Sequence, residues 1–548
     1  MKLLAMTKKK LVLISCLSGL LLSFAWLDLL FAPLMLVAFV PMLWVEDYIS
    51  KNNEDKRFSS YAGFAYSYLP FLIWNATTIF WVSFSTPAAL VLPFFQASLM
   101  ALAFQLFHWA KRVFGVEKKI NYVFFIIFFL AFEFLELNWD FNFPWLNLGN
   151  SFAKFPALVQ WYEYTGVAGG SLWILISNVF VLFFLNGVLE KYFNKKIFYS
   201  FALIICSPII ISLTIYFTYQ EDKTKGSDVV VVQPNLDPYE EQYTFSPQMV
   251  CQIIEDLTLQ KADENTDFVL CPESCIQEYA WEEYLEETPS IEYLRGVSNR
   301  FPKLEFIAGM SSRKRVEESQ RTIATREHKR YGFLYENYNT AIKIDRDTLS
   351  PKSQIRHKSV LTPAVEKMPL QKYLSFMENF ILDLGGTVGS LGTDKEFKVF
   401  SSKNKPKTAT AICYESVDGG YVAELVNAGA ELLFIITNDG WWKNTPGHRQ
   451  HASFASLRAI ENRRYIARSA NTGISCFISP KGEVLQETKY WQEDVIKQTL
   501  YPQTKKTFYT RYGDYIYRTA SFLAVLSILL GLVNNVLKKK KNVLENQY

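Results

Sequence analysis

Apolar runs long enough to cross a membrane fill most of the first 218 residues, and one more lies near the C-terminus. A run of about 18 or more apolar residues predicts a transmembrane helix. We expect eight such helices, at residues 10–26, 29–46, 60–82, 88–110, 121–138, 168–190, 197–218 and 515–537. The chain is therefore predicted to be a multi-pass membrane protein that carries one large water-soluble insert.

Lysine and arginine residues gather in alternate connections between these segments. They precede the first segment, lie after the second, fourth and sixth, and follow the last, at Lys8–Lys10, Lys51–Arg57, Lys111–Lys119, Lys191–Lys196 and Lys538–Lys541. The other connections before the insert carry a single positive residue, Lys154. Because cytoplasmic loops are enriched in Lys and Arg, this pattern predicts that both chain termini are cytoplasmic and that the insert lies on the outer side.

The length of 548 residues exceeds one ordinary domain, and the apolar pattern divides it into three parts. We expect a transmembrane domain of seven helices at 1–218, an extracytoplasmic domain at 219–512, and a C-terminal transmembrane helix with a basic cytoplasmic tail at 513–548. Within the insert, the stretch 311–335 mixes charges of both signs. This mixture predicts a solvated excursion or hairpin and no nucleic-acid partner.

The cysteines and histidines do not form a pattern that indicates a metal or a disulfide framework. The seven cysteines are odd in number and irregularly spaced. Cys271 and Cys275 lie four residues apart, but no second pair with metal-ligand spacing accompanies them. His448 and His451 suggest a metal pair without a third ligand, so satisfied imidazoles at the start of a helix are favoured. We expect no metal and no cofactor.

Short runs rich in Val, Ile and Phe alternate with helix-like segments through the insert. The expected strands are Val229–Val232, Phe268–Cys271, Glu305–Ala308, Ala341–Ile344, Thr408–Cys413, Leu432–Thr437 and Ser475–Ser479. The expected helices are Pro247–Lys261, Ser290–Arg300, Tyr421–Asn427 and His451–Asn462. Several of the strands are continuously apolar, which indicates burial on both faces. The alternation predicts an α/β layered domain.

Cys413 ends one of these apolar runs, directly before a helix-like segment. A cysteine near a helix N-terminus is stabilised as a thiolate by the helix dipole. Such a residue is a candidate nucleophile. The alternative is a buried structural cysteine, which is the commonest role of a free cysteine.

Charged residues also follow other strand ends. Glu273 comes after Pro272, which cannot continue a central strand, so its carboxylate is expected at the strand tip. Beside apolar residues its pKa would rise and it could serve as a base; the alternative is a surface glutamate. Lys358 and Glu366 lie eight residues apart in a loop-like stretch, which could equally be an exposed basic loop.

The connection 139–167 is rich in aromatic and amide side chains, including Trp145. This composition is typical of the membrane–water interface. It predicts an interfacial anchor or, alternatively, a surface through which lipid reaches the insert.

Four motifs occur in the order of the Glu-Lys-Cys triad of the nitrilase superfamily: Pro272-Glu273, Lys358, Cys413-Tyr414-Glu415 and Asn438-Asp439-Gly440-Trp441. The multi-helix N-terminal part, Phe143-Pro144-Trp145 and the single C-terminal helix accompany them. Taken together, the chain resembles the apolipoprotein N-acyltransferase family. The resemblance implies a multi-pass α-helical membrane domain of eight helices and an α/β nitrilase-like αββα sandwich domain.

The resemblance also implies roles for individual residues. Cys413 would be the nucleophile, Glu273 the general base and acid, and Lys358 the oxyanion stabiliser. Glu366, Glu415 and Tyr414 would support them, and Trp145, Tyr239 and Trp441 would contact lipid or mobile loops. The sequence departs from the family at Val360 and at Ala364-Val365, where a His and a Phe-Gly are usual; the family's mobile-loop Trp is replaced by Tyr239 or Tyr243.

The activity that the resemblance implies is transfer of a fatty acyl chain from a membrane phospholipid to the α-amine of a diacylglyceryl-cysteine at a lipoprotein N-terminus. A thioester on Cys413 and ping-pong kinetics are expected. The implied location is the bacterial inner membrane, with the catalytic domain periplasmic, and we expect a monomer. The alternatives are a membrane-tethered amidase or nitrilase acting on a small C–N substrate, and a transporter or lipid-binding scaffold with an inactive domain.

Overall fold

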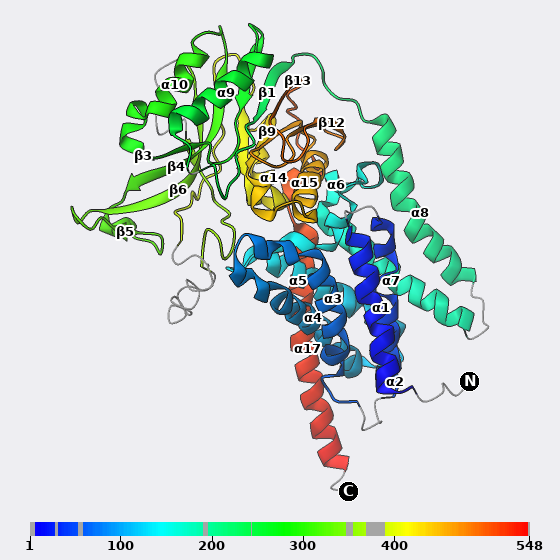
Figure 1. Cartoon of the computed structure of the whole chain (residues 1–548). Helices are drawn as coiled ribbons and strands as arrows, with labels where there is room; N and C mark the ends of the chain where they lie inside the picture. The colour runs from blue at the N-terminus through cyan, green and yellow to red at the C-terminus, as the bar shows by residue number, and fades with distance from the viewer. Residues whose placement is uncertain are drawn as a thin grey trace. The chain divides into compact units, whose positions relative to one another are not determined.

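The computed structural model describes residues 6–27, 31–52, 58–189, 195–242, 244–346, 355–368 and 390–545. The chain divides into two compact units. The helical unit comprises Met1–Phe80, Leu90–Thr214 and Asp514–Tyr548, and the α/β unit comprises Trp81–Ala89 and Ile215–Gly513. Figure 1 shows the elements of both units.

Eight helices match the eight expected apolar segments in order: α1 (Lys8–Trp26), α2 (Val40–Lys51), α3 (Ala62–Thr78), α4 (Leu92–Phe114), α5 (Val123–Asn138), α7 (Val167–Leu189), α8 (Lys195–Thr218) and α17 (Tyr515–Glu545). Within the described residues, seven helical stretches are long and apolar enough to cross a membrane. The exception is α3, which has 17 residues and contains Pro70. The expected segment 60–82 continues past it as a 3₁₀ helix, Phe80–Phe84.

A buried ion cluster lies where α2 and α4 approach their C-terminal ends. The Lys111 ammonium lies 2.7 Å from Glu46 Oε2 and 3.1 Å from Asp47 Oδ1, and it also donates to the Tyr122 hydroxyl. Lys111 is completely buried. Charged groups in membrane segments are costly unless they are paired, so this arrangement stabilises the packing of the helices that carry it.

The α/β unit contains two sheets. The larger has the order β13-β1-β2-β4-β6-β5, with β3 paired to β4 and β7 paired to β6; the smaller has the order β12-β11-β10-β9-β8. The strands of the larger sheet are β1 (Ser227–Gln233), β2 (Thr266–Leu270), β3 (Ile276–Trp281), β4 (Glu305–Arg315), β5 (Arg326–Glu327), β6 (Leu334–Ile344), β7 (Ile355–His357) and β13 (Asp494–Leu500). Those of the smaller are β8 (Thr408–Ile412), β9 (Leu432–Thr437), β10 (Ile466–Ala470), β11 (Cys476–Ile478) and β12 (Val484–Glu487).

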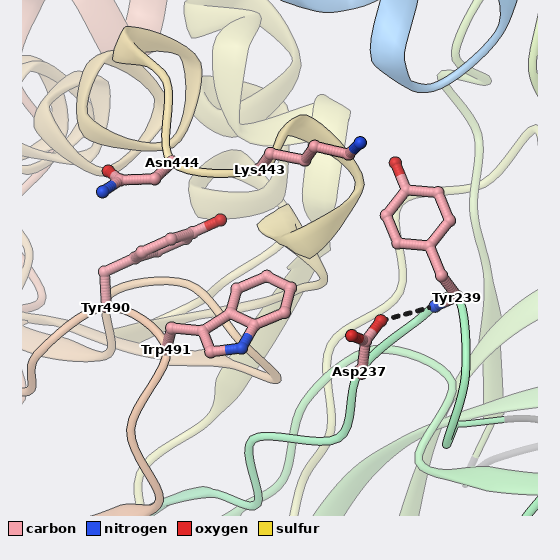
Figure 2. Close-up of a pocket in the computed structure, with 6 residues that line it drawn as sticks. All are labelled: Asp237, Tyr239, Lys443, Asn444, Tyr490 and Trp491. Carbon is pink, nitrogen blue, oxygen red and sulfur yellow. Dashed lines mark hydrogen bonds between the residues drawn. The ribbon is translucent and has the colours of Figure 1, made fainter.

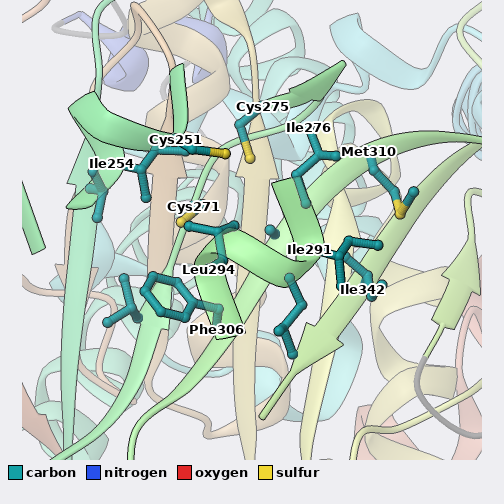
Figure 3. Packing of buried hydrophobic residues seen from close by; sticks show 14 of the residues in the cluster. Cys251, Ile254, Cys271, Cys275, Ile276, Ile291, Leu294, Phe306, Met310 and Ile342 are labelled. Atoms are coloured by element: carbon teal, nitrogen blue, oxygen red, sulfur yellow. The ribbon is translucent and has the colours of Figure 1, made fainter. Parts of the chain in front are cut away.

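Helices cover the outer face of each sheet. The larger sheet packs against α9 (Pro247–Lys261) and α10 (Pro289–Ser298), and the smaller against α14 (Gly419–Asn427) and α15 (Pro446–Asn462) (Figure 1). Apolar residues of α9, α10 and the larger sheet interlock in the outer core (Figure 3). The four layers are helix, sheet, sheet and helix, which confirms the expected αββα sandwich.

The sequence of strand β1 is continuously apolar because each face of the strand packs into a different core. Val230 and Val232 point into the outer core with α9, whereas Val229 and Val231 point into the core between the two sheets. Both faces of the strand are therefore buried, as the run predicts.

Most expected elements are confirmed, with shifted ends. Helix α9 has the predicted bounds, while α15 begins five residues earlier than expected. Strands β4 and β6 extend beyond the apolar runs and form a long hairpin over 311–335, which confirms the predicted hairpin. Strands β3, β5, β7, β10, β12 and β13 are short or mixed in polarity and were not expected.

Candidate active site

Three strand ends supply the predicted triad. Glu273 follows β2 by three residues, Lys358 comes directly after β7, and Cys413 comes directly after β8. The Lys358 ammonium lies 3.3 Å from Glu273 Oε1. The Cys413 thiol is close enough that the charges of both residues shift its pKa. The fold thus brings together three residues that are up to 140 positions apart in the chain.

The backbone of the larger sheet holds Glu273 in place. The Gly309 N–H donates to the Pro272 carbonyl at 3.1 Å. A β-carbon on Gly309 would lie 2.6 Å from the α-carbon of Glu273, closer than real contacts allow. Only glycine therefore permits this approach of β4 to the loop that carries Glu273.

Lys358 is enclosed by two carboxylates and one amide. Its Nζ lies 2.8 Å from Glu366 Oε2 as well as 3.3 Å from Glu273 Oε1. Asn339 on β6 donates through Nδ2 to both carboxylates, at 2.7 Å to Glu273 and 2.9 Å to Glu366. Lys358 is 1% exposed. We refer to these four residues as the lysine cage.

The two carboxylates of the lysine cage differ in proton affinity. Burial raises the pKa of Glu273 above its usual range, and the Lys358 ammonium offsets only part of this effect. At Glu366 burial acts in the same direction, but Lys358 and the Thr362 N–H outweigh it and lower the pKa. Burial opposes the charged form of Lys358, yet the two carboxylates raise its pKa. Glu366 is therefore the fixed counter-ion, and Glu273 is the better proton acceptor.

Cys413 has a left-handed backbone, with φ of 50°. It begins a short 3₁₀ helix, Cys413–Val417, and α14 starts only at Gly419. The expected stabilisation of the thiolate at a helix N-terminus is wrong: burial raises the pKa of the thiol, the Glu273 carboxylate raises it further, and Lys358 acts in the opposite direction. The thiol consequently needs a base to remove its proton.

Glu415 connects the backbone segment that carries Lys358 to the segment that carries Cys413. Its carboxylate accepts both bonds from Arg356 Nη2, at 2.7 and 2.8 Å. It also accepts from the backbone N–H groups of Ile412 and Ser359, at 2.7 and 2.6 Å. These two residues precede Cys413 and follow Lys358, so Glu415 fixes the backbone beside both of them.

A second polar network lies behind Cys413. His451 Nε2 lies 3.2 Å from the Cys413 carbonyl oxygen and 3.0 Å from the Ser416 hydroxyl. Its Nδ1 lies 2.9 Å from Asp439 Oδ1, and Arg468 Nη2 donates to the other oxygen of Asp439 at 2.6 Å. The interpretation as a satisfied imidazole is confirmed for His451, whereas His448 Nδ1 is buried with no hydrogen-bond partner among the described residues. The protein contacts of His451 fix the turn that begins at Cys413.

The loop after Lys358 closes through its own backbone. The Thr362 N–H donates to Glu366 Oε2 at 2.8 Å, and the Thr362 carbonyl accepts from the Glu366 N–H at 2.9 Å. Ala364 at the tip has φ of 65°, a conformation that favours glycine. Ala364 and Val365 thus form the outer turn, while Glu366 returns to Lys358.

Two of the expected loop residues contact each other. The Tyr239 hydroxyl donates to the Trp441 carbonyl at 2.8 Å, and the two rings meet edge to face at 5.3 Å. Beside them is a pocket of about 420 Å³ (Figure 2), lined by Asp237, Tyr239, Lys443, Asn444, Tyr490 and Trp491. Tyr243 lies outside the described residues. Roles of Tyr239 and Trp441 toward a substrate stay predictions.

The remaining supporting residues are buried. Tyr414 is 4% exposed next to the nucleophile candidate. Trp145 is 1% exposed within the helical unit, where its ring stacks with Phe143 at 6.4 Å. A contact of Trp145 with lipid stays a prediction.

Comparison with known proteins covers both units. Residues 229–507 match the carbon-nitrogen hydrolase family, and residues 18–180 match the N-terminal domain of apolipoprotein N-acyltransferase. The Chlorobaculum tepidum apolipoprotein N-acyltransferase is 29% identical over 94% of this chain and 96% of its own length. The chain belongs to the apolipoprotein N-acyltransferases of the carbon-nitrogen hydrolase superfamily.

Other relatives of this acyltransferase are more distant in sequence. The Haemophilus influenzae apolipoprotein N-acyltransferase is 26% identical over 97% of this chain and 96% of its own length. Among solved structures, Nit3 of Saccharomyces cerevisiae is 16% identical, with a TM-score of 0.35 over 52% of this chain and 93% of that one.

Two residues of the acyltransferase site were not expected from the sequence. Asn339 lies inside a long strand and belongs to no motif. Arg356 belongs to the loop-like stretch for which an exposed basic loop was the alternative, and its 1% exposure rules this alternative out at position 356. Its spacing of two from Lys358 would have placed both side chains on one face of a strand, which is the signal that could have identified it.

Proposed function

We propose that this acyltransferase moves a fatty acyl chain from a membrane phospholipid to the α-amine of a diacylglyceryl-cysteine, through a thioester on Cys413. The observation that supports this most directly is the contact of Lys358 with Glu273 at 3.3 Å, near enough to Cys413 for both charges to shift the pKa of its thiol, in a chain that matches the family over both units. A thiol next to a base with raised pKa and a fixed ammonium suits acyl transfer through a covalent intermediate.

In the first half-reaction, Glu273 takes the proton of the Cys413 thiol as sulfur attacks the ester carbonyl carbon. The carbonyl oxygen becomes an oxyanion that the Lys358 ammonium stabilises. When the intermediate collapses, the carbon–oxygen bond to the glycerol breaks. The leaving alkoxide takes the proton from Glu273, which releases lysophospholipid and leaves a thioester.

In the second half-reaction, the neutral α-amine of the acceptor attacks the thioester carbonyl and gives a proton to Glu273. Lys358 again stabilises the oxyanion. The carbon–sulfur bond then breaks, the amide is released, and Cys413 regains its proton from Glu273. Glu366 keeps Lys358 charged through both steps, because its own pKa is lowered.

The location is part of the same proposal. The membrane-length helices and the bacterial relatives support a multi-pass protein of the bacterial inner membrane. The positive residues in alternate connections support cytoplasmic termini and a periplasmic catalytic domain at 219–512, between the membrane domain 1–218 and the C-terminal segment 513–548. The protein would act as a monomer without a cofactor, with the bilayer, a phospholipid and a lipoprotein as partners.

Mass spectrometry of the purified protein tests the covalent intermediate. Incubation with phospholipid micelles of one defined acyl chain is expected to add the mass of that chain to the peptide containing Cys413. A synthetic diacylglyceryl-cysteine peptide should then remove the adduct and yield the N-acylated peptide, because its free amine attacks the thioester. The same peptide with a blocked amine serves as the control and should leave the adduct in place.

A different outcome would favour the alternative. If no phospholipid acylates Cys413 and the protein instead hydrolyses small amides or nitriles, it is a membrane-tethered amidase or nitrilase and the proposal fails.

The pH dependence of acylation tests the assignment of Glu273. A base acts when deprotonated, so the rate should fall as the pH drops through its pKa, with a midpoint above the ordinary glutamate value of 4.5. Asn339 donates a bond that lowers this pKa, so Asn339→Ala should move the midpoint to higher pH. Rates are measured from adduct formation at each pH, with return to neutral pH to exclude acid inactivation. A midpoint at or below 4.5, or one unmoved in Asn339→Ala, would contradict the role.

A further inference from the structure

His357 immediately precedes Lys358 and lies between two carboxylates. Its Nε2 lies 2.7 Å from Glu282 Oε1, and its Nδ1 lies 3.1 Å from Asp394 Oδ1. Its backbone N–H also donates to Asp394 Oδ2 at 3.1 Å. His357 is 3% exposed. The residue is absent from the acyl-transfer steps above, yet it occupies the last position of the strand that presents Lys358.

The two contacts require a doubly protonated ring. A neutral imidazole has one N–H donor and one acceptor nitrogen, and an ionised carboxylate only accepts. With a carboxylate oxygen at each nitrogen, both hydrogen bonds form only if His357 is an imidazolium. Burial opposes this charge, but the hydrogen bonds that the ring donates to Asp394 and Glu282, together with their negative charges, outweigh it and raise the pKa of His357.

The surrounding groups hold the two carboxylates in place. The Ser312 hydroxyl donates to Glu282 Oε1 at 2.9 Å, and the Lys398 ammonium lies 2.8 Å from Asp394 Oδ2. The ring of Tyr338 stacks on the imidazole at 3.9 Å, with its hydroxyl donating to Glu336. Three ion pairs thus join four described residues whose charges alternate in sign: Glu282 pairs with His357, His357 with Asp394, and Asp394 with Lys398. We refer to these four residues as the imidazolium clamp.

The clamp is connected to the lysine cage through backbone bonds. The Lys358 N–H donates to the Asn339 carbonyl at 2.8 Å, and Asn339 in turn bonds both carboxylates of the cage. The segment that carries Asp394 is tied to the same loop, because the Leu391 N–H donates to the Glu366 carbonyl at 3.1 Å. Asp394 therefore links two segments: its carboxylate contacts His357 on β7, and its own chain segment is bonded to the backbone of Glu366.

We propose that His357 is a positioning residue for acyl transfer, whose imidazolium joins Glu282 to Asp394 and thereby holds Lys358 and Glu366 in their reactive arrangement. This inference rests on the proposed function of Lys358. Loss of the ring proton breaks one of the two carboxylate bonds. The loop 358–368 then loosens, and the ammonium no longer lies where the oxyanion develops. Acylation should therefore decline at alkaline pH as His357 loses its proton.

The sign of the charge effects gives a sharp test. The midpoint of the alkaline decline in the acylation rate is measured from adduct formation on Cys413. Asp394→Asn removes a negative charge next to the ring and should move the midpoint to lower pH by about one unit. Lys398→Met removes a positive charge from the same series and should move it to higher pH. Lys403→Met, an exposed lysine near the same segment, is the matched control and should not move it.

His357→Gln provides a second measurement. Gln cannot become a cation, so the alkaline decline should vanish while the rate at neutral pH falls, by about a hundredfold if the ammonium shifts by an ångström. Hydrogen–deuterium exchange should rise in 358–368 and stay unchanged in β8, which separates a loosened loop from general unfolding.

The outcomes separate this inference from the function on which it depends. If the unmodified protein is not acylated on Cys413, the proposed function fails. If it is acylated, but His357→Gln retains the alkaline decline or Asp394→Asn and Lys398→Met shift the midpoint in the same direction, His357 is a structural residue only.

Discussion

Replacing Cys413 with alanine is expected to reduce acyl transfer by at least about a thousandfold, because loss of the nucleophile removes the covalent route altogether. The fold should persist. Alanine differs from cysteine only by the missing sulfur, and it keeps the same left-handed backbone, with φ of 50°. Transfer to a diacylglyceryl-cysteine peptide and acyl labelling by phospholipid are the two measurements.

Cys476→Ala is the matched control. Cys476 is another free cysteine of the α/β unit and is buried on β11. Its replacement should leave acyl labelling intact. Labelling of another cysteine in Cys413→Ala at the rate of the unmodified protein would overturn the assignment of the nucleophile, and so would full transfer activity in that variant.

Lys358→Met should impair both the reaction and the stability. Loss of one oxyanion donor typically costs about 3–4 kcal/mol of transition-state stabilisation, a factor of roughly a hundred to a thousand in rate. Breaking a buried ion pair by removing one partner typically costs about 3–5 kcal/mol of folding free energy. The cost arises here because Glu273 and Glu366 would keep their burial without their counter-ion.

A second substitution separates these two effects. In Lys358→Met/Glu366→Gln the carboxylate at position 366 is removed together with the ammonium, which leaves Glu273, the carboxylate with the raised pKa, as the remaining acidic group of the lysine cage. Thermal unfolding should return most of the way to that of the unmodified protein, while acylation should remain as slow as in Lys358→Met. Recovery of the rate together with the stability would show that Lys358 acts on the fold and not on the oxyanion.

From the sequence, the candidate reacting residues can be predicted better than the residues that hold them in place. Glu273 and Cys413 could be selected because each lies at or just after the end of an apolar run, which becomes β2 of the larger sheet and β8 of the smaller one. Two further residues that contact this site could not be identified in the same way. Asn339 reaches both carboxylates from the middle of β6, and His451 reaches the Cys413 carbonyl across 38 positions of the chain.

Predictions from local sequence patterns were wrong for two backbone features, the turn after Cys413 and the length of the third apolar helix. The thiolate at Cys413 was inferred from a following helix, but the chain first makes a 3₁₀ turn and the regular helix begins at Gly419. The third apolar segment was inferred from length and composition, but its helix ends at Thr78 after 17 residues. In both places hydrophobicity predicts burial correctly, while the turn geometry depends on contacts that hydrophobicity does not encode.

The α/β unit includes Trp81–Ala89, a strip of chain that precedes the rest of the unit by more than a hundred residues. Trp81 is 1% exposed and meets Trp442 at 4.7 Å, and its ring occupies the space where Gly447 has no side chain. Burying a tryptophan contributes on the order of 4 kcal/mol. A fragment excised at 219–512 would lack this strip and expose the surface under it. The α/β unit is thus not a transplantable module, because part of its core comes from the connection between α3 and α4.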